Sequence, residues 1–321
     1  MSEKRPTIDD FKRIPAREKN KLKRFGVLYA DEVLIFTRSM LIEYVGLSPE
    51  AADKVLNEAV DLTGENEQIM TLKELEEKEK KKEFLTTGSK NLDNILQGGY
   101  LTKTVTEFAG EYGTGKTQTC YTAIATALLP PDEGGLNTGN ISVILMDTEE
   151  AFTHERMLPI FRRFDIDPRE AIERIIVMRP RTSHEQLRMI LSSLPKIREK
   201  NARLFIIDSI TKLPRIDFEG RGELYERQRM ILLMVESLRR IAKLYNMVAL
   251  ITNQVVAVPE ESFDRKQIPA GGNVLGHTVD TRLYIKRLSG DIRLVEILDS
   301  SWLPPRKTKI RITDAGITDV N

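Results

Sequence analysis

The sequence is poor in aromatic side chains, in cysteine and in net charge. Phe, Trp and Tyr make up 6% of its 321 residues and hydrophobic residues as a whole 40%, so the core must be mainly aliphatic. The single cysteine, Cys120, excludes an intramolecular disulfide and is typical of a reducing compartment. Because the formal net charge is only +1, any binding to nucleic acid must rely on local basic patches.

Long apolar runs are also absent. No segment reaches the length of a membrane span, and the polar start MSEKRPTIDDFKR does not resemble a signal peptide. We therefore expect a soluble intracellular protein without a membrane partner, cytoplasmic and associated with the nucleoid. The length favours two domains, or one large domain with a small appendage.

The residue pattern divides the chain into three parts. Residues 1–62 carry short helical patterns, among them a turn at Gly46 and a helix that Ser48 would cap. Residues 63–83 are highly charged, as in a linker followed by an exposed helix. In residues 84–321, short apolar strands alternate with amphipathic helices and end in three strands without helices between them. This predicts an α/β core, with a mainly parallel sheet flanked by helices and extended at one edge by a meander.

A complete phosphate-binding loop, GEYGTGKT, follows the apolar strand TVTEFA and precedes a helical pattern. Its glycines allow successive backbone N–H groups to point at phosphate oxygens, and the helix that begins at Gly115 adds the positive end of its dipole. Lys116 would reach the β- and γ-phosphates, and Thr117 would ligate Mg²⁺. The sequence therefore predicts ATP and Mg²⁺ as ligands. The predicted nucleotide-binding residues of the loop are Gly110, Glu111, Tyr112, Gly113, Thr114, Gly115, Lys116, Thr117 and Gln118.

Carboxylates follow two other predicted strands. Asp208 ends the apolar run LFIID, and a charge at the tip of a buried strand is costly unless a cation pairs with it, so we expect Asp208 to share Mg²⁺ with Thr117. Asp147, Glu149 and Glu150 end the run ISVILMDTEE, at the edge where ligands bind in open α/β sheets. Each is able to orient or deprotonate a water molecule, and the residue pattern does not choose among them or exclude a solvated acidic turn.

Taken in order, these motifs resemble those of the RecA/RadA superfamily, in particular the archaeal RadA and eukaryotic Rad-type recombinases. The resemblance covers nearly the whole chain and includes LTTGSKNLD, the phosphate loop, IDS, GRGEL, TNQVV and GGN. It implies a RecA-like ATPase core preceded by a helix-hairpin-helix domain. It also implies an ATP-dependent recombinase that assembles with its own copies, as a ring or filament, on single-stranded DNA and exchanges strands with double-stranded DNA. Recombinase mediators would be further partners.

The resemblance assigns roles to single residues. Glu149 matches the glutamate that activates water, and Gln254 matches the glutamine that senses the γ-phosphate, so the implied catalytic residues are Lys116, Glu149 and Gln254. Arg156 matches the arginine that packs on adenine. The residues implied to contact DNA, in two loops of the core and one hairpin of the helical domain, are Arg221, Arg227, Arg265, Lys266 and Gly46.

The family joins its subunits through a Phe-x-x-Ala linker motif, which corresponds here to Ile69-Met-Thr-Leu72. The other residues implied at the subunit interface are His277, Asp299 and Pro304. The chain departs from the family pattern at this linker, at Glu150 beside the implied catalytic glutamate, and in the first glycine hairpin, which is lost. These departures keep an alternative open: a divergent paralogue that binds ATP and acts as a mediator or regulator of a recombinase.

Overall fold

The computed structural model describes residues 5–64, 71–79, 82–257, 267–269, 276 and 278–320. Ile69, Arg265, Lys266 and His277 therefore lie outside the described residues. The chain divides into two compact units, Met1–Lys82 with Arg188–Glu199, and Glu83–Leu187 with Lys200–Asn321. Within the described ranges, no helix is both long enough and apolar enough to cross a membrane.

The first unit contains short helices. They are η1 (Ile8–Asp10), α1 (Ala16–Phe25), α2 (Ala30–Val33), α3 (Arg38–Met40), η2 (Leu41–Val45), α4 (Pro49–Thr63) and α5 (Leu72–Glu79). The Ser48 side chain accepts a hydrogen bond of 3.2 Å from the Ala51 N–H and so caps α4, as the sequence predicts. Gly46 has the left-handed backbone angle, φ 78°, that ends the preceding turn. Apolar side chains from both sides of this turn are buried: Leu41, Val45, Leu47, Ala52 and Val55.

The second unit is built on a large sheet. Its strands are β3 (Val105–Gly110), β4 (Ser142–Asp147), β5 (Ile175–Met178), β6 (Ala202–Asp208), β7 (Val248–Ala257), β8 (Gln267–Pro269), β9 (Thr281–Ser289), β10 (Ile292–Ser300), β11 (Lys307–Thr313) and β12 (Gly316–Asp319). They lie in the order β12-β11-β10-β9-β3-β7-β6-β4-β5, and β8 pairs with β7. The neighbours from β9 to β5 are parallel, whereas β9 to β12 form an antiparallel meander.

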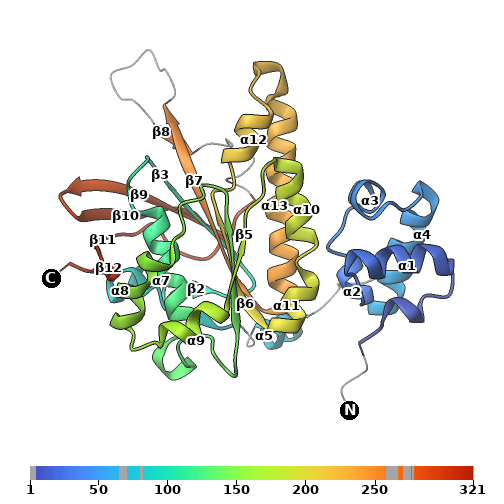
Figure 1. Ribbon diagram of the computed structural model, residues 1–321, viewed down its shortest axis with the longest axis horizontal. Helices are drawn as coiled ribbons and strands as arrows, with labels where there is room; N and C mark the ends of the chain where they lie inside the picture. The colour runs from blue at the N-terminus through green and yellow to red at the C-terminus, as the bar shows by residue number, and fades with distance from the viewer. Residues whose placement is uncertain are drawn as a thin grey trace. The chain divides into compact units, whose positions relative to one another are not determined.

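Helices cover the parallel strands. The described helical segments of this unit are α6 (Lys90–Ile95), α7 (Lys116–Ala127), η3 (Pro131–Glu133), α8 (His154–Arg163), α9 (Pro168–Glu173), α12 (Lys212–Asp217), η4 (Arg221–Glu223) and α13 (Leu224–Tyr245), while α10 (Ser183–Leu191) and α11 (Leu194–Lys200) contribute residues to both units. Figure 1 shows α7, α8 and α9 on one side of the parallel strands and α12 and α13 on the other. A separate antiparallel pair joins β1 (Phe84–Leu85) to β2 (Tyr100–Leu101).

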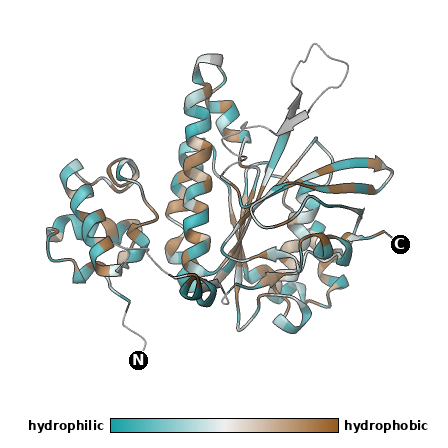
Figure 2. Cartoon of the chain, turned by 180° about the vertical axis from the view of Figure 1, so that it is seen from behind, coloured by the Kyte–Doolittle hydropathy of each residue, from teal (hydrophilic) through white to brown (hydrophobic). Residues whose placement is uncertain are grey.

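Burial explains why this arrangement forms. Every residue of β3, β4 and β6 is buried, as expected for parallel strands covered on both faces. Figure 2 shows hydrophobic and hydrophilic residues interspersed along α13. The buried residues of this helix include Met234, Val235, Leu238 and Ile241, which share one helical face.

The predicted α/β class and the antiparallel extension are confirmed. The extension has one strand more than predicted, because β12 is only four residues long and carries a weak signal.

Candidate nucleotide-binding site

The phosphate-binding loop connects β3 to α7. The strand ends at Gly110, and the helix begins at Lys116 directly after Gly115, which has φ 101°. A Cβ atom at Gly115 would lie 2.7 Å from Cδ1 of Ile312, closer than van der Waals contact allows. Both the backbone angle and this neighbour therefore require glycine at the N-terminus of α7, where the helix dipole and free N–H groups favour an anion.

The Lys116 side chain folds back onto the phosphate-binding loop that precedes it. Its Nζ atom donates hydrogen bonds of 2.8 Å to the carbonyl oxygens of Gly110 and Glu111, and the residue is 9% exposed. Burial lowers the pKa of Lys116, while the carboxylates of Asp208 and Glu149 act in the opposite direction. The loop thus presents a partly desolvated cation, which interacts strongly with an incoming negative charge.

Two hydroxyl groups and one carboxylate form the candidate metal site. Thr117 Oγ1 donates to Oδ2 of Asp208 over 2.8 Å, and Thr252 Oγ1 donates to Oδ1 of the same carboxylate. Burial raises the pKa of Asp208, and these two hydrogen bonds oppose that shift. A buried carboxylate beside a threonine hydroxyl fits Mg²⁺, which takes oxygen ligands and commonly uses one or two carboxylates together with substrate phosphate.

The described residues hold no group of three or more histidine, cysteine, aspartate or glutamate side chains suited to a metal ion. A cage built from protein ligands alone is therefore not found in that part of the chain. The Thr117–Asp208 pair fits instead a cation that shares its coordination with the phosphates of a nucleotide.

The structure distinguishes the three carboxylates that follow β4. Asp147 accepts backbone hydrogen bonds from Ala151 and Phe152, at 3.2 and 3.1 Å, and lies 3.3 Å from the Arg179 guanidinium, so it stabilises the turn. Glu150 is exposed and has φ 57°. Glu149 alone of the three lines the pocket beside the phosphate loop.

That pocket has a volume of about 400 Å³. It brings together predicted residues from four elements: Lys116 and Thr117 at the start of α7, Glu149 after β4, Asp208 at the end of β6, and Gln254 on β7. Its full lining is Tyr112, Gly113, Gly115, Lys116, Thr117, Gln118, Glu149, Ala151, Asp208, Ser209, Thr252, Gln254, Arg293 and Ile312. These side chains converge because the parallel strands end at the same edge of the sheet.

Several lining residues were not predicted. Ser209 and Thr252 belong to the IDS and TNQVV motifs but were not assigned to the site, whereas Arg293 on β10 and Ile312 on β11 come from the antiparallel extension. Arg293 Nε donates to the Thr114 carbonyl oxygen over 3.0 Å and so supports the phosphate loop. No local pattern indicates this contact, because the two residues are 179 positions apart.

Arg156, predicted to pack on adenine, lies on α8 outside this pocket lining. Its guanidinium donates to the Gln118 side chain and to the carbonyl oxygens of Asp314 and Thr313, at 2.5 and 3.0 Å. Arg156 thus joins the first turns of α7 to the turn between β11 and β12. Gln118 connects it to the wall of the pocket.

The described members of the predicted DNA-binding and interface groups lie outside this pocket lining. The Gly46 carbonyl accepts a hydrogen bond of 2.6 Å from Lys21 Nζ in the first unit. Arg227, in the first turn of α13, donates to the Phe218 carbonyl oxygen over 3.4 Å, and Arg221 lies on η4. The remaining described members of these predicted groups are exposed: Leu72 (81%), Asp299 and Pro304.

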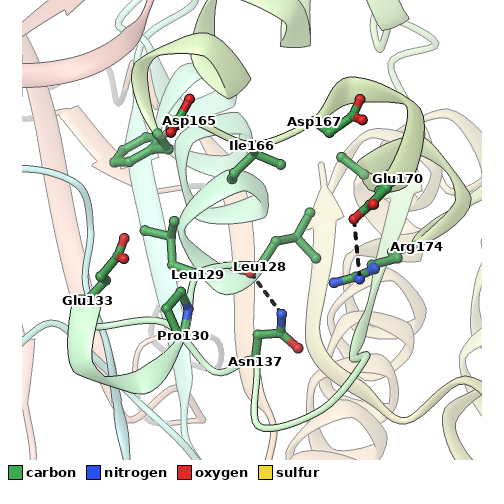
Figure 3. A pocket seen from close by; sticks show the side chains of 12 residues that line it. Leu128, Leu129, Pro130, Glu133, Asn137, Asp165, Ile166, Asp167, Glu170 and Arg174 are labelled. Carbon is green, nitrogen blue, oxygen red and sulfur yellow. Dashed lines mark hydrogen bonds and ion pairs between the residues drawn. The ribbon is translucent and has the colours of Figure 1, made fainter.

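A second pocket, of about 310 Å³, has the opposite electrostatic character. Figure 3 shows Glu133, Asp165, Asp167 and Glu170 around it, with Arg174 at 3.9 Å from the Glu170 carboxylate. Four carboxylates and one guanidinium repel a phosphate group. The pocket of the phosphate loop is therefore the candidate nucleotide site.

The fold and the site define a P-loop nucleotide-binding protein of the α/β class. A family model described as Rad51 matches residues 78–320. The DNA repair protein RAD51 of Saccharomyces cerevisiae is 36% identical over 303 residues, which cover 93% of this chain and 74% of the relative. The meiotic recombination protein DMC1 homologs A and B of Oryza sativa subsp. japonica are each 37% identical over 302 residues, covering 93% of this chain and 86% of the relative.

The chain therefore belongs to the Rad51 family, which confirms the resemblance that its motifs indicate.

Proposed function

We propose that this Rad51-family protein is an ATP-dependent DNA recombinase. It assembles on single-stranded DNA, pairs that strand with a homologous duplex, and hydrolyses ATP during the cycle. The observation that carries this proposal is the convergence of Lys116, Thr117, Asp208, Glu149 and Gln254 in one pocket. The names of the relatives, a DNA repair protein and two meiotic recombination proteins, support the assignment to recombination.

Each residue has a distinct task in hydrolysis. Lys116 and the N–H groups of the loop bind phosphate oxygens, and Thr117 with Asp208 would hold Mg²⁺. Bound Mg²⁺ neutralises the charge that develops on the phosphates. Glu149 orients the attacking water and accepts its proton. Strand exchange itself breaks no covalent bond in DNA, so this ATPase site supplies the only bond-breaking chemistry proposed.

Gln254 supplies the proposed connection between nucleotide and DNA. It lies on β7, which lines the pocket and continues into residues 255–257. We assign residues 255–270, with Arg265 and Lys266, to a DNA-binding loop. Arg215 Nη1 lies 3.5 Å from Gln254 Oε1, and it begins the other proposed DNA segment, residues 215–227. Gln254 thus directly precedes one proposed DNA segment in the chain and contacts the first residue of the other. A movement of its side chain on nucleotide binding would therefore affect both segments.

Self-assembly requires a receptor for the linker stretch Ile69–Leu72. The second unit has an apolar pocket of about 240 Å³ lined by Phe152, His154, Met157, Phe161, Ile172, Ile175 and Val177. We propose that the linker stretch of a second copy binds there. Since each copy has one linker and one pocket, the contact is head-to-tail and generates a ring or an open filament.

The test compares ATP hydrolysis by the native chain and Lys116→Ala, with and without single-stranded DNA, alongside a strand-exchange assay. We expect DNA-stimulated hydrolysis and joint molecules from the native chain, and neither from the variant. Arg169→Ala serves as a control, because it removes an exposed arginine outside the pocket. ATP binding without DNA stimulation and without joint molecules would refute the recombinase proposal.

ATP binding without DNA stimulation and without joint molecules would support the alternative, a divergent paralogue acting as a mediator. Three departures from the family pattern favour it: Leu72 replaces the alanine of the linker motif, Glu150 adds a carboxylate directly after Glu149, and the first glycine hairpin is lost. A mediator would bind ATP and a partner recombinase but would form no joint molecules alone.

A further inference from the structure

Lys212 lies beside the candidate catalytic glutamate. It is the first residue of α12, four positions after Asp208. Its Nζ atom donates a hydrogen bond of 2.8 Å to the Thr148 carbonyl oxygen and lies 3.5 Å from Oε2 of Glu149. The ammonium group thus contacts both the peptide carbonyl before Glu149 and the carboxylate of Glu149 itself.

The backbone around Glu149 is held on both sides. The Thr148 N–H donates to the Asp208 carbonyl oxygen over 2.8 Å, and the Ser209 N–H donates to Thr148 Oγ1 over 2.8 Å, so the tips of β4 and β6 are joined. Glu150, with φ 57°, then turns the chain away. Since the backbone is fixed in this way, the remaining freedom of Glu149 is in its side chain.

Two contacts restrict that side chain. Ser209 Oγ donates to Oε1 of Glu149 over 3.4 Å, and Lys212 faces Oε2. Lys212 also offsets repulsion, because Asp208 and Glu149 stand at the same edge of the sheet and line the same pocket. Without the ammonium group, this repulsion and the loss of one contact would allow the carboxylate to turn toward solvent.

We propose that Lys212 is a positioning residue for Glu149, holding its carboxylate in the pocket wall for water activation. This inference rests on the proposed ATPase function. Lys212 is 33% exposed and Glu149 29%, so solvent screens their attraction, and exposed ion pairs contribute little to stability. The consequence of losing Lys212 is therefore expected in the rate of hydrolysis rather than in folding.

The test uses Lys212→Met and Lys212→Arg in the full-length protein, with kcat and KM for ATP measured in the presence of single-stranded DNA. Lys212→Met keeps the length of the side chain without its charge, and we expect kcat to fall about tenfold with KM and melting temperature unchanged. Lys212→Arg retains the charge and the donors and should recover most of the loss. Lys196→Met is the matched control, because it removes an exposed lysine–glutamate pair, Lys196–Glu199 at 2.9 Å, away from the pocket.

Each other result overturns the inference. An unchanged or increased kcat in Lys212→Met would mean that Lys212 does not position the base, and a raised KM with normal kcat would assign it to nucleotide binding. Equal losses in Lys212→Met and Lys212→Arg, with a lower melting temperature, would assign it to folding. A native chain that hydrolyses no ATP would refute the ATPase proposal and this inference together, whereas an active native chain with an unaffected Lys212→Met would refute this inference alone.

Discussion

Thr117 donates its hydroxyl hydrogen to Oδ2 of Asp208 over 2.8 Å, although 91 positions separate them in the chain. The contact forms because α7 starts, and β6 ends, at the same edge of a parallel sheet. Neither residue alone is a metal site. Their proximity, together with Thr252 on the intervening strand β7, produces an oxygen-lined position next to the phosphate loop.

Thr252→Val tests whether this carboxylate needs its second hydrogen bond. The change is nearly isosteric and removes the hydroxyl that donates to Asp208 Oδ1 at a fully buried position. We expect the Mg²⁺ concentration for half-maximal ATP hydrolysis to rise about tenfold, because supporting partners of ligands tune metal affinity. The measurement is a Mg²⁺ titration of ATPase rate. Thr106→Val, at a buried position of β3, is the control, and an Mg²⁺ dependence identical in both variants would count against the assigned role.

Gly115→Ala should damage both stability and nucleotide binding. The added Cβ would meet Cδ1 of Ile312 at 2.7 Å, on a backbone with φ 101°. Gly290→Ala is the matched control, since Gly290 also has a positive φ, 52°, but no atom lies within 4 Å of its Cβ position. Backbone strain alone costs about 1–2 kcal/mol. Because the collision with Ile312 adds to this cost only in Gly115→Ala, we expect urea unfolding to show a larger loss of stability in Gly115→Ala than in Gly290→Ala. Gly115→Ala should also lose ATP binding.

Combining Gly115→Ala with Ile312→Val separates strain from collision. Valine lacks the Cδ1 atom, so the double variant should recover part of the stability but not the part due to the backbone angle. Additive losses in the double variant would show that Ile312 does not set the requirement for glycine.

The Asp319 carboxylate gives a pH-dependent contribution to stability. It accepts hydrogen bonds from Ser89 Oγ at 2.5 Å and from the N–H groups of Asn91 and Lys90 at 3.0 and 3.3 Å, at the N-terminus of α6. Burial alone would raise the pKa of Asp319, but these hydrogen bonds and Arg163 outweigh it and hold the pKa below its usual 3.8. A lowered pKa means that the contribution is present above about pH 4 and disappears as the pH falls through the folded value.

We therefore expect Asp319→Asn to lower the melting temperature by a few degrees at pH 7, about 1 kcal/mol as for a helix cap. The difference from the native chain should shrink as the pH falls below 4, which thermal scans across pH would measure. Asp291→Asn, at an exposed ion pair 3.2 Å from Arg311, is the control. A difference that persists at low pH would exclude the carboxylate charge as its cause.

The sequence predicts the local parts of the site better than the assembled pocket. The phosphate loop, Asp208 and Glu149 each follow a strand with a clear pattern, so their convergence follows from a parallel sheet. Arg293 and Ile312 could not be predicted, because the antiparallel extension folds back onto the loop through contacts far apart in sequence.

The partners of single charged residues do not follow from the sequence. Lys212 belongs to none of the motifs, and only the structure brings it next to Glu149. The role of Arg156 toward adenine stays a prediction from the resemblance, and the structure adds its hydrogen bonds to Gln118 and to the turn after β11. Propensity and spacing do not determine such partners, because a long side chain reaches several neighbours that only the tertiary structure selects.

Ile172→Asp tests the proposed receptor for the linker. Ile172 lines the apolar pocket and is 46% exposed, so an aspartate there places a charge in the pocket without burying it in the core. We expect the assembled form to dissociate in sedimentation experiments, while the melting temperature of the subunit changes little. Leu288→Asp is the control, because Leu288 is 45% exposed and lies on β9, outside the pocket lining. Assembly that survives Ile172→Asp, or that is lost equally in both variants, would argue against this pocket.

Trp302 reports on assembly directly, because it is the only tryptophan in the chain. Trp302 is 36% exposed, and its ring centroid lies 6.2 Å from that of Phe84. In the sequence it stands between the proposed interface residues Asp299 and Pro304. If ATP-dependent assembly covers this segment, the tryptophan emission should shift to shorter wavelength as protein concentration rises with ATP present. Ile172→Asp should show no such shift, since it binds ATP without assembling. A shift of equal size in that variant would instead trace the signal to nucleotide binding within one subunit, and the Asp299–Pro304 segment would lose its assignment to the interface.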